Sequence, residues 1–587
     1  MKMRFTELFG IKQMRKSNEA KRMKQISLIV FLGLALIGCS AKESSNTGEA
    51  GNQALLTGVV EDDQSKPLNG VMVRVTNETS GVSQSVFTDE KGRYELSTRL
   101  TGDVTVRFRL PYYKDETNKL MLTVGKSVEQ QAVLKPMTDL AEISESLPSV
   151  YHFGKLAFDK DPKAINSRQN LMRDCAGCHA LGNSVTHALR PLDQWVDMVT
   201  MMQTYLGNPD PKLIKSRAAL LYAGFNGQAP KVRPVFPIDA EIQRAVIHEY
   251  RLANSIFPHD ADINPADGLV YTVDRTANHM TVTDLDSGKS LFVQQPPSMR
   301  PAVGKGDSYS QRSRDPGPHS LALGKNGYWY TTNAGSDEIG VFDPKTRTWK
   351  ASFVLPEGAR YPHTIRIGRD GIIWFTLAAS TQVGRLDPVS GDIKLIYLPN
   401  VKPLGGSAGT VPYGIDISPV DGRIWYARLW GDKLGAIDPK TFAVTEFDSP
   451  VEGPRRLRFD AKGKLWVTGY NEGMIAMVDT NSMKSEVYPM PEFAAGYRPA
   501  PYALAIHPVT QEVWINETLT DRVYRFLPKQ KRFIVYPMPL RGTFTRDFTF
   551  TASGWACTTN SPILNAALEG NETEVICIDP SGAKARK

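Results

Sequence analysis

The chain has almost no excess of either charge once its first residues are set aside. It holds 70 Lys and Arg against 62 Asp and Glu, and the first 38 residues account for eight and two of these, which leaves 62 against 60. No clustered Lys and Arg stripe with interleaved aromatic residues occurs, so we expect no nucleic-acid partner. Low-complexity tracts are also missing, and 41% of the residues are hydrophobic. This composition predicts a folded chain, and its length predicts several domains.

The apolar run near the start of the chain is too short to cross a membrane. Residues 26–37 follow three basic residues, and these twelve residues do not span a hydrocarbon core of ~30 Å. The run therefore predicts a signal peptide, with Met1 or Met23 as the first residue. Its end, Leu36-Ile37-Gly38-Cys39, resembles a lipobox, which implies lipid on Cys39. Because Ser40 resembles the outer-membrane address of such signals, we expect a periplasm-facing outer-membrane lipoprotein, or one at the cell surface.

Cysteine is scarce, with five residues in the chain, but two cysteines share one motif. Cys175, Cys178 and His179 form a C-x-x-C-H sequence, which is typical of c-type haem attachment. Two thiols at this spacing add to the two vinyl groups of a haem, and the adjacent histidine reaches the iron. A zinc site would need two further ligands, and only His187 is near. Together with export, the motif predicts one haem c per chain.

The second axial ligand of that haem has four candidates: Met198, Met201, Met202 and His187. Residues 195–202 resemble the Trp-x-x-x-Val-x-x-Met segment of small cytochromes c, which implies Met202 as the ligand, ahead of Met201. Methionine ligation raises the potential of a haem and favours electron transfer.

Residues 54–136 alternate apolar and polar positions in short runs between turn signals, which predicts a small β-sandwich. Gly58-Val59-Val60, residues 67–71 and residues 88–94 of this segment resemble the carboxypeptidase regulatory-like domain. The segment contains no constellation of acids, bases or metal ligands. A structural spacer or adhesive module is the interpretation that we favour.

Residues 150–256 have a helical pattern, and we interpret them as a cytochrome c-like domain. The expected helices are Ala164–Arg173, Leu192–Tyr205, Pro211–Tyr222 and Ile238–Leu252. The last of these, with Tyr250, resembles the C-terminal helix of cytochromes c. Residues 39–53 are rich in Ser, Asn and Gly, and are interpreted as a flexible tether after a signal peptide of residues 1–38.

A repeat with a period in the forties fills residues 257–587. Its units open near residues 258, 318, 362, 412, 454, 501 and 546, and most have an aromatic strand about a dozen residues later. Four short strands per unit at this period are typical of a β-propeller blade, so the repeat predicts seven blades. The last unit ends before its fourth strand. We expect an upstream segment, within residues 231–236, to supply that outer strand.

Cys557 and Cys577 remain once the lipid and the haem have taken the other three cysteines. In an oxidising compartment such a pair is expected to form a disulfide. Cys557 stands where other blades place their second-strand tryptophan, and Cys577 lies on the next strand. A cross-strand disulfide would therefore pin the ring near its closure.

The repeats with Pro-His/Tyr-x-Ile, Trp-Phe-Thr and Ile-Gly-Arg-Leu-Asp-Pro resemble the virginiamycin B lyase family, seven-bladed propellers that open a cyclic depsipeptide by elimination. That family pairs a histidine after the opening proline with a glutamate three residues after the tryptophan of the same blade. Thr332 and Leu377 stand near the glutamate position in the blades of His319 and His363. Glu517 does stand there, but its blade opens with Tyr502. No blade reproduces the pair.

The blade openings should converge at one end of the central channel, which is where ligands usually bind. The candidate substrate-binding or catalytic residues are His259, His319, His363, Tyr413, Arg428, Tyr502 and Glu517, with Arg455 at a further opening. Each residue could instead cap its own blade. We expect a mainly β, multidomain haem protein that couples electron transfer to the binding or oxidation of a small organic molecule and passes electrons to a soluble carrier. The alternatives are a lyase with an accessory haem, and a non-catalytic scaffold or sensor.

Overall fold

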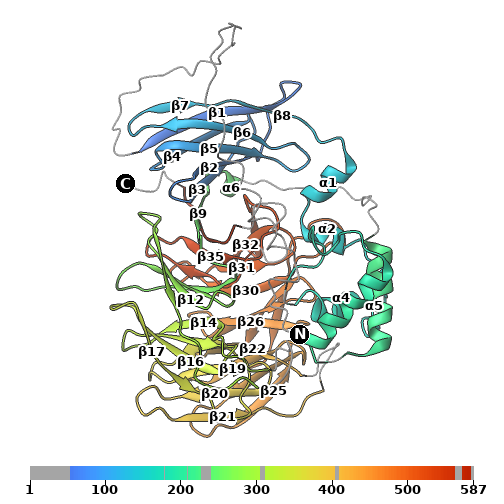
Figure 1. Cartoon of the computed structure of the whole chain (residues 1–587), viewed down its shortest axis with the longest axis vertical. Coiled ribbons are helices and arrows are strands. Elements are labelled where there is room, and N and C mark those ends of the chain that lie inside the picture. Colours follow the sequence, from blue (N-terminus) through green and yellow to red (C-terminus); the bar gives the residue numbers. More distant parts are fainter. Residues whose placement is uncertain are drawn as a thin grey trace, which may run out of the picture. The chain divides into compact units, whose positions relative to one another are not determined.

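The computed structural model describes residues 53–177, 179–207, 209–225, 240–303, 311–402, 409–561 and 572–582. The signal peptide, Cys39, the tether up to residue 52, Cys178 and residues 231–236 lie outside these ranges. All described residues belong to one compact unit, residues 43–587. The fold is mainly β and has several domains (Figure 1). In the described ranges, no helix has both the length and the apolar character needed to cross a membrane.

The N-terminal domain is a β-sandwich of two four-stranded sheets. One sheet has the order β4-β1-β7 with β8 also paired to β1, and the other contains β3-β2-β5-β6. Alternate residues of β1 and β5 are buried, as expected for strands with one face on a core. The strands are β1 Ala54–Asp62, β2 Met72–Asn77, β3 Val82–Phe87, β4 Arg93–Thr98, β5 Gly102–Arg109, β6 Glu116–Leu122, β7 Ser127–Glu129 and β8 Ala132–Leu134.

The helical segment follows the sandwich. Its helices are α1 Leu140–Ser146, α2 Ser149–Phe153, α3 Arg168–Asp174, α4 Leu192–Tyr205, α5 Pro211–Gly224 and α6 Ala240–Arg244. The Ser167 hydroxyl caps α3 by accepting from the Asn170 N–H, so α3 begins four residues later than the pattern of residues 164–173 suggests. Asp210 caps α5 in the same way, and Pro211 follows at a favourable first position.

Six separate four-stranded sheets form the first six blades of a β-propeller. Each inner strand from β10 to β26 contacts the inner strand of the next blade, and β10 also contacts β34 and β35, so the ring closes. The strands are β10 Pro258–Ile263, β11 Val270–Asp274, β12 His279–Thr283, β13 Ser290–Gln294; β14 Pro318–Leu323, β15 Trp329–Asn333, β16 Glu338–Asp343, β17 Thr348–Val354; β18 Pro362–Ile367, β19 Ile373–Leu377, β20 Gln382–Leu386, β21 Ile393–Tyr397; β22 Pro412–Ile417, β23 Ile424–Arg428, β24 Lys433–Ile437, β25 Val444–Asp448; β26 Pro454–Phe459, β27 Lys464–Gly469, β28 Met474–Asp479, β29 Ser485–Pro489; β30 Pro501–Ile506, β31 Val513–Glu517, β32 Arg522–Leu527 and β33 Arg532–Pro537.

The seventh blade contains β34 Thr549–Phe550, β35 Ala556–Asn560, β36 Glu574–Asp579 and, as its outer strand, β9 Val246–Arg251. An upstream segment does close the ring, but it is β9 and not residues 231–236. The other edge of β9 pairs with β3 of the sandwich. One eight-stranded sheet therefore runs from the seventh blade into the sandwich, so the sandwich is joined to the propeller by backbone hydrogen bonds.

The prediction of a helix at Ile238–Leu252 is wrong for most of that range. Only α6, a five-residue helix, forms there, and Tyr250 lies on β9 in a core with Val82 and Trp555. Strands β3 and β36 pair with the two edges of β9, and this pairing outweighs a weak helical pattern. The propeller therefore begins upstream of residue 257, and the C-terminal cytochrome helix is absent from the described residues 240–252.

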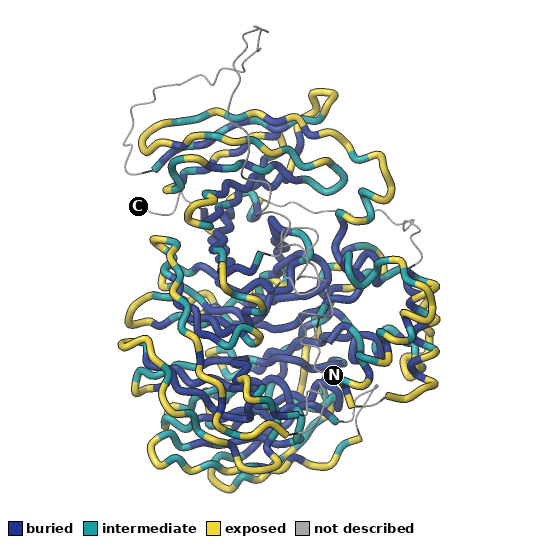
Figure 2. Tube along the Cα trace, viewed as in Figure 1, coloured by how far each residue is buried: buried dark blue, intermediate teal, exposed yellow. Residues whose placement is uncertain are grey.

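Burial follows this architecture (Figure 2). The outer strands β13, β17, β25 and β29 have no buried residue, whereas β9 has five buried residues. The difference arises because β3 covers the edge of β9.

Candidate functional site

Seven buried side chains meet where the inner strands of the propeller begin. Each of the first six inner strands starts with proline, which is tolerated at the first position of a strand because no ladder donor is lost there. The second residue of the strand then meets its counterparts from other blades. These residues, which we call the opening ring, are His259 on β10, His319 on β14, His363 on β18, Tyr413 on β22, Arg455 on β26, Tyr502 on β30, and Arg546 just before β34.

Aromatic contacts and hydrogen bonds connect the opening ring. The ring centroids of His259 and His319 are 3.5 Å apart, those of His319 and His363 are 4.0 Å apart, and those of His363 and Tyr413 are 3.8 Å apart. The hydroxyl oxygens of Tyr413 and Tyr502 are 2.7 Å apart. The Tyr502 hydroxyl is also 3.5 Å from His259 Nε2. The sequence-predicted histidines and tyrosines therefore form one cluster.

Two arginines complete the cluster. Arg455 Nη2 donates to the Tyr413 hydroxyl over 2.7 Å, and its Cζ lies 3.9 Å from the centre of the Tyr502 ring. Arg546 Nη1 donates to the Tyr502 hydroxyl over 2.9 Å. The two cations therefore flank one phenol.

The three histidines of the opening ring are neutral near pH 7. Burial lowers the pKa of His259 to about 3, and the Arg546 cation acts in the same direction against an opposing Asp260 carboxylate. Burial also holds the pKa values of His319 and His363 well below the usual range. Nδ1 of His319 has no hydrogen-bond partner among the described residues. Within the same ranges, no group of three or more His, Cys, Asp or Glu side chains could hold a metal ion.

A network of ion pairs supports the opening ring. His259 Nδ1 is 2.9 Å from Asp260 Oδ1. Arg456 donates to both oxygens of Asp260, over 2.8 and 2.9 Å, and to Asp547 over 2.8 Å. Paired charges of this kind are the form in which buried arginine is tolerated.

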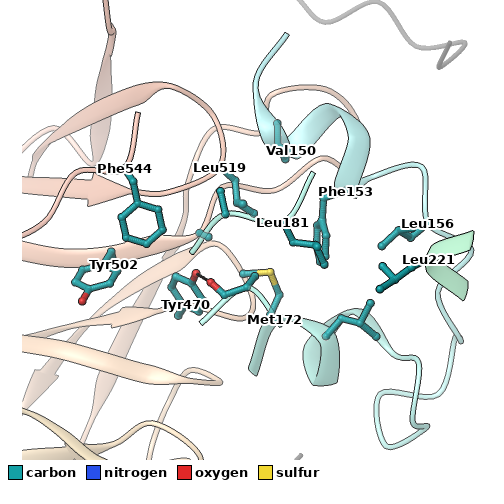
Figure 3. Close-up of a cluster of buried hydrophobic side chains, with 14 of the residues drawn as sticks. Val150, Phe153, Leu156, Met172, Leu181, Leu221, Tyr470, Tyr502, Leu519 and Phe544 are labelled. Atoms are coloured by element: carbon teal, nitrogen blue, oxygen red, sulfur yellow. Dashed lines mark hydrogen bonds between the residues drawn. The ribbon is translucent and has the colours of Figure 1, made fainter. Parts of the chain in front are cut away.

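The C-x-x-C-H segment packs directly against this cluster. Arg455 Nη2 donates to the carbonyl oxygen of Gly177 over 2.6 Å. The Tyr470 hydroxyl donates to the carbonyl oxygen of Ala176, the contact drawn as a dashed line in Figure 3. Both acceptors lie between the two cysteines of the motif.

Other contacts fix the helical segment on the propeller. Arg173 Nη2 donates to Asp432 over 2.8 Å, and Trp430 Nε1 donates to the Arg173 carbonyl oxygen over 3.2 Å. The N–H of Val150 donates to the carbonyl oxygen of Leu519 over 2.8 Å. One apolar cluster spans both parts (Figure 3) and includes Val150, Phe153, Met172, Leu181 and Leu221 with Tyr470, Tyr502, Leu519 and Phe544.

His179 is oriented by its neighbour. Its Nδ1 is 3.1 Å from the carbonyl oxygen of Ala180, and because a carbonyl only accepts, Nδ1 carries the proton and Nε2 keeps its lone pair. His187 differs, since its Nδ1 contacts the Gly182 carbonyl oxygen at 2.9 Å and its Nε2 contacts Glu145 at 2.7 Å. Both nitrogens of His187 are therefore engaged, which disfavours it as an axial ligand.

Helix α4 carries the three candidate methionines. Its buried side chains are Trp195, Val199 and Gln203, while Met198, Met201 and Met202 are partly exposed. No described contact joins any of these methionines to His179. Trp195 Nε1 and Gln203 Oε1 are buried without a hydrogen-bond partner in the described ranges.

Two sequence-predicted residues lie outside the opening ring. Arg428 bonds to Thr410 and to the Pro399 carbonyl oxygen, over 3.0 and 2.6 Å, and its Nε is 2.6 Å from Glu446 on the outer strand of its own blade. The carboxylate of Glu517 accepts from the N–H groups of Leu519 and Thr520, over 2.8 and 2.7 Å. Glu517 therefore caps a turn of its own blade, whereas Arg428 connects its strand to the segment before β22 and to the outer strand β25.

Cys557 and Cys577 form a disulfide between directly paired residues of β35 and β36, as expected from the sequence.

Three residues that contact or support the opening ring, Tyr470, Asp260 and Arg456, were not predicted from the sequence. Asp260 and Arg456 directly follow opening residues, and this position could have identified them. The sequence contains no signal that residues 176 and 177 contact Tyr470 and Arg455.

Comparison with known proteins gives matches for two segments. Residues 298–491, in which blades two to five lie, match the model of the virginiamycin B lyase family, and residues 56–135 match that of the carboxypeptidase regulatory-like domain. No curated protein matches the chain. Among solved structures, a streptogramin B lyase is 20% identical with a TM-score of 0.46, over 57% of this chain and 98% of its own. A selenomethionine-substituted virginiamycin B lyase from Staphylococcus aureus is 20% identical with a TM-score of 0.45, over 57% of this chain and 99% of its own.

Proposed function

We propose that this chain is an exported c-type haem protein in which the opening ring binds a small organic molecule for oxidation. The observation that carries the proposal is the hydrogen bond from Arg455, a member of the ring, to Gly177 within the C-x-x-C-H motif. A molecule held by the ring lies close to the segment that attaches the haem. Electrons would leave the haem to a soluble carrier.

The residues of the helical segment fit a haem. Cys175 and Cys178 would hold it covalently, and His179 and Met202 would bind its iron. The bond from His179 Nδ1 to a backbone carbonyl leaves Nε2 available, which is the usual preparation of a histidine ligand. The buried, unpartnered Trp195 Nε1 and Gln203 Oε1 offer polar groups on the inner face of α4. When bound, a haem supplies one-electron exchange.

The opening ring supplies binding and proton transfer. Neutral imidazoles accept hydrogen bonds from a substrate, while the tyrosine hydroxyls and the two guanidiniums donate hydrogen bonds to it. Because all seven side chains are buried, these interactions are strengthened by the low local dielectric.

A haem assay tests the first half of the proposal. We expect a pyridine haemochrome measurement to give one haem per chain, and a value near zero or near two would refute it. Met202→Ala should abolish the sulfur-to-iron charge-transfer band, with Met201→Ala as the matched control. Loss of the band in Met201→Ala instead would reassign the ligand.

Reduction of the haem by candidate small molecules tests the second half. His319→Ala and His363→Ala should each lower substrate-dependent haem reduction substantially, while the haem spectrum and the folding stay unchanged. If both variants reduce haem like the parent but unfold at a lower temperature, the histidines are structural caps and the site lies elsewhere.

A lyase is the second candidate function, and the family match over residues 298–491 favours it. Elimination needs no electron acceptor, so Cys175→Ser would leave lyase turnover intact, whereas it would abolish oxidation. Ligand binding without any turnover would instead support a scaffold or sensor.

We also propose that lipid on Cys39 anchors the chain to the outer membrane, facing the periplasm or the cell surface. The basic and apolar leader that ends at Cys39 supports this location. Cys39→Ala should move the protein into the soluble fraction, and unchanged membrane retention would refute the proposal.

A further inference from the structure

The phenol of Tyr502 is surrounded by donors and cations. Arg546 Nη1 lies 2.9 Å from its oxygen, and the Tyr413 hydroxyl lies 2.7 Å from it. The Cζ atoms of Arg455 and Arg456 lie 3.9 and 5.7 Å from the ring centre. The groups that face Tyr502 are thus three guanidiniums, one phenol and, at 3.5 Å, the Nε2 of His259, with the apolar Phe544 ring at 5.7 Å.

Two of these cations lack an acidic partner. Arg456 is paired with Asp260 and Asp547. Arg455 and Arg546, in contrast, form no salt bridge with any carboxylate in the described ranges, and both are buried. Burying an unpaired charge is costly, so the cluster favours an anion between these two residues. Tyr502 is the group in contact with both.

His259 is arranged to accept a hydrogen bond from Tyr502. Its Nδ1 lies 2.9 Å from the Asp260 carboxylate, which can only accept, so Nδ1 carries the proton and the lone pair of Nε2 faces the Tyr502 oxygen. Two bonds from Arg456 hold Asp260 in place. The three groups are hydrogen-bonded in the same order as a nucleophile–histidine–aspartate triad, with a phenol in place of the nucleophile.

We infer that Tyr502 is a general base held by His259 and Asp260 in a hydrogen-bonded relay, in which the Tyr502 phenolate removes a proton from the bound molecule. The inference rests on the proposed function, because it assigns a role in substrate oxidation to the opening ring. The substrate class is an alcohol or another molecule with a weakly acidic X–H bond. That bond breaks with its electron pair left on X, an O–H bond forms on Tyr502, and the resulting phenol donates a hydrogen bond to Nε2 of His259, which stays neutral. Tyr502 is the catalytic residue, and His259 and Asp260 position it.

The electrostatics agree with this assignment. Burial raises the pKa of Tyr502, but the Arg546, Arg455 and Arg456 cations outweigh burial, so its pKa lies below the ordinary tyrosine value. Burial instead holds the pKa of Tyr413 well above that value. Tyr413 therefore stays protonated, and its hydroxyl donates a hydrogen bond to the Tyr502 oxygen.

The ionisation of Tyr502 is measurable without turnover. Ultraviolet difference spectra of the full-length protein across pH, taken as parent minus Tyr502→Phe, cancel the haem absorbance and isolate one tyrosinate. We expect this signal to rise below pH 10, the ordinary pKa of tyrosine. Arg546→Gln should raise its midpoint by about one pH unit, a tenfold change in the ionisation constant. Tyr470→Phe is the control and should leave the midpoint unchanged.

A difference signal that appears only at or above pH 10 would overturn the relay, as would a midpoint that Arg546→Gln does not move. Under the relay, His259→Gln lowers kcat more than it changes KM and shifts the acidic limb of the pH profile; a purely structural histidine would lower thermal stability and leave the limb in place. Haem content is assayed on the same samples. Haem-loaded protein without the tyrosinate signal refutes the relay alone, and haem-free protein with the signal refutes only the haem proposal.

Discussion

Arg455 donates a hydrogen bond to the carbonyl oxygen of Gly177 across 278 residues of sequence. The same guanidinium lies 4.6, 4.4 and 3.9 Å from the ring centres of Tyr413, Tyr470 and Tyr502. One side chain therefore connects an inner propeller strand, the C-x-x-C-H segment and the phenols of the opening ring. Arginine suits this position because its planar group stacks on aromatic rings while its N–H groups donate in the plane.

We expect Arg455→Gln to destabilise the protein by about 1.5–3 kcal/mol, the usual contribution of a buried hydrogen bond to a charged group. Urea unfolding measures the change. Arg99→Gln is the matched control, because Arg99 is 61% exposed and its partner Asp286 is 92% exposed. Equal unfolding midpoints for the two variants would show that the Gly177 contact contributes nothing.

The propeller was predictable because its signals are local. An opening proline, a second-strand tryptophan and an Asp-Pro turn recur in most blades, and each has a local physical role; the Asp343 carboxylate, for example, accepts from the N–H of Lys345 two residues later. The spacing of these recurring residues fixes where each blade begins, and so which residues form the opening ring. Its histidines and tyrosines could therefore be named before their contacts were known.

The closing strand and the docking of the helical segment were not predictable in this way. Residues 246–251 form a strand because β3 and β36 flank it, and both partners are distant in sequence. The contacts of residues 176 and 177 with Tyr470 and Arg455 depend likewise on tertiary packing. The same limit explains Glu517, whose spacing suggests catalysis although its carboxylate caps a turn.

The disulfide of the seventh blade should stabilise the closed ring. Replacing both Cys557 and Cys577 with serine removes a cross-link between β35 and β36, beside the outer strand β9. We expect a loss of about 2–4 kcal/mol in the free energy of unfolding, measured with denaturant. Addition of reductant to the parent should reproduce the loss and leave the double variant unchanged; an unchanged parent stability would contradict the prediction.

Arg74 should be needed to join the sandwich to the propeller. Its Nε lies 2.8 Å from Glu249 on β9, and its Nη2 lies 3.1 Å from Glu574 on β36. Burial and the nearby Glu249 raise the pKa of Glu574, and the Arg74 cation opposes them. Arg74→Met leaves these carboxylates without a cation, so we expect a loss of about 3–5 kcal/mol in unfolding experiments.

The exposed Arg93 provides the control for Arg74, since Arg93→Met removes a cation from the same domain. Adding Glu574→Gln to Arg74→Met should recover part of the loss, because it removes one of the stranded charges. If the double variant is no more stable than Arg74→Met, the unpaired carboxylates do not cause the destabilisation.

Acid should destabilise the protein through buried histidines. Burial lowers the pKa of His152 to about 3, with a smaller contribution from His187, and burial does the same to His259. In the unfolded chain these histidines bind protons near their ordinary pKa of 6.5, whereas in the folded protein they bind them only near pH 3. The unfolded state therefore holds more protons between these two values, so stability falls as pH is lowered through that window. Above pH 7 both states are neutral at these positions, and the histidines contribute no pH dependence.

Removing one such histidine with His152→Gln should reduce the slope of unfolding free energy against pH by about 1.4 kcal/mol per unit within the window. Urea unfolding of parent and variant at a series of pH values measures this difference, with pH 8 as the reference at which the variant loses only contacts of the neutral ring, namely the bond to the Ser144 carbonyl oxygen and the stacking on His187. The two stability curves should converge as pH falls from 6.5 toward 3; curves that stay parallel would mean that His152 is protonated in the folded protein and that its burial has little effect on its pKa.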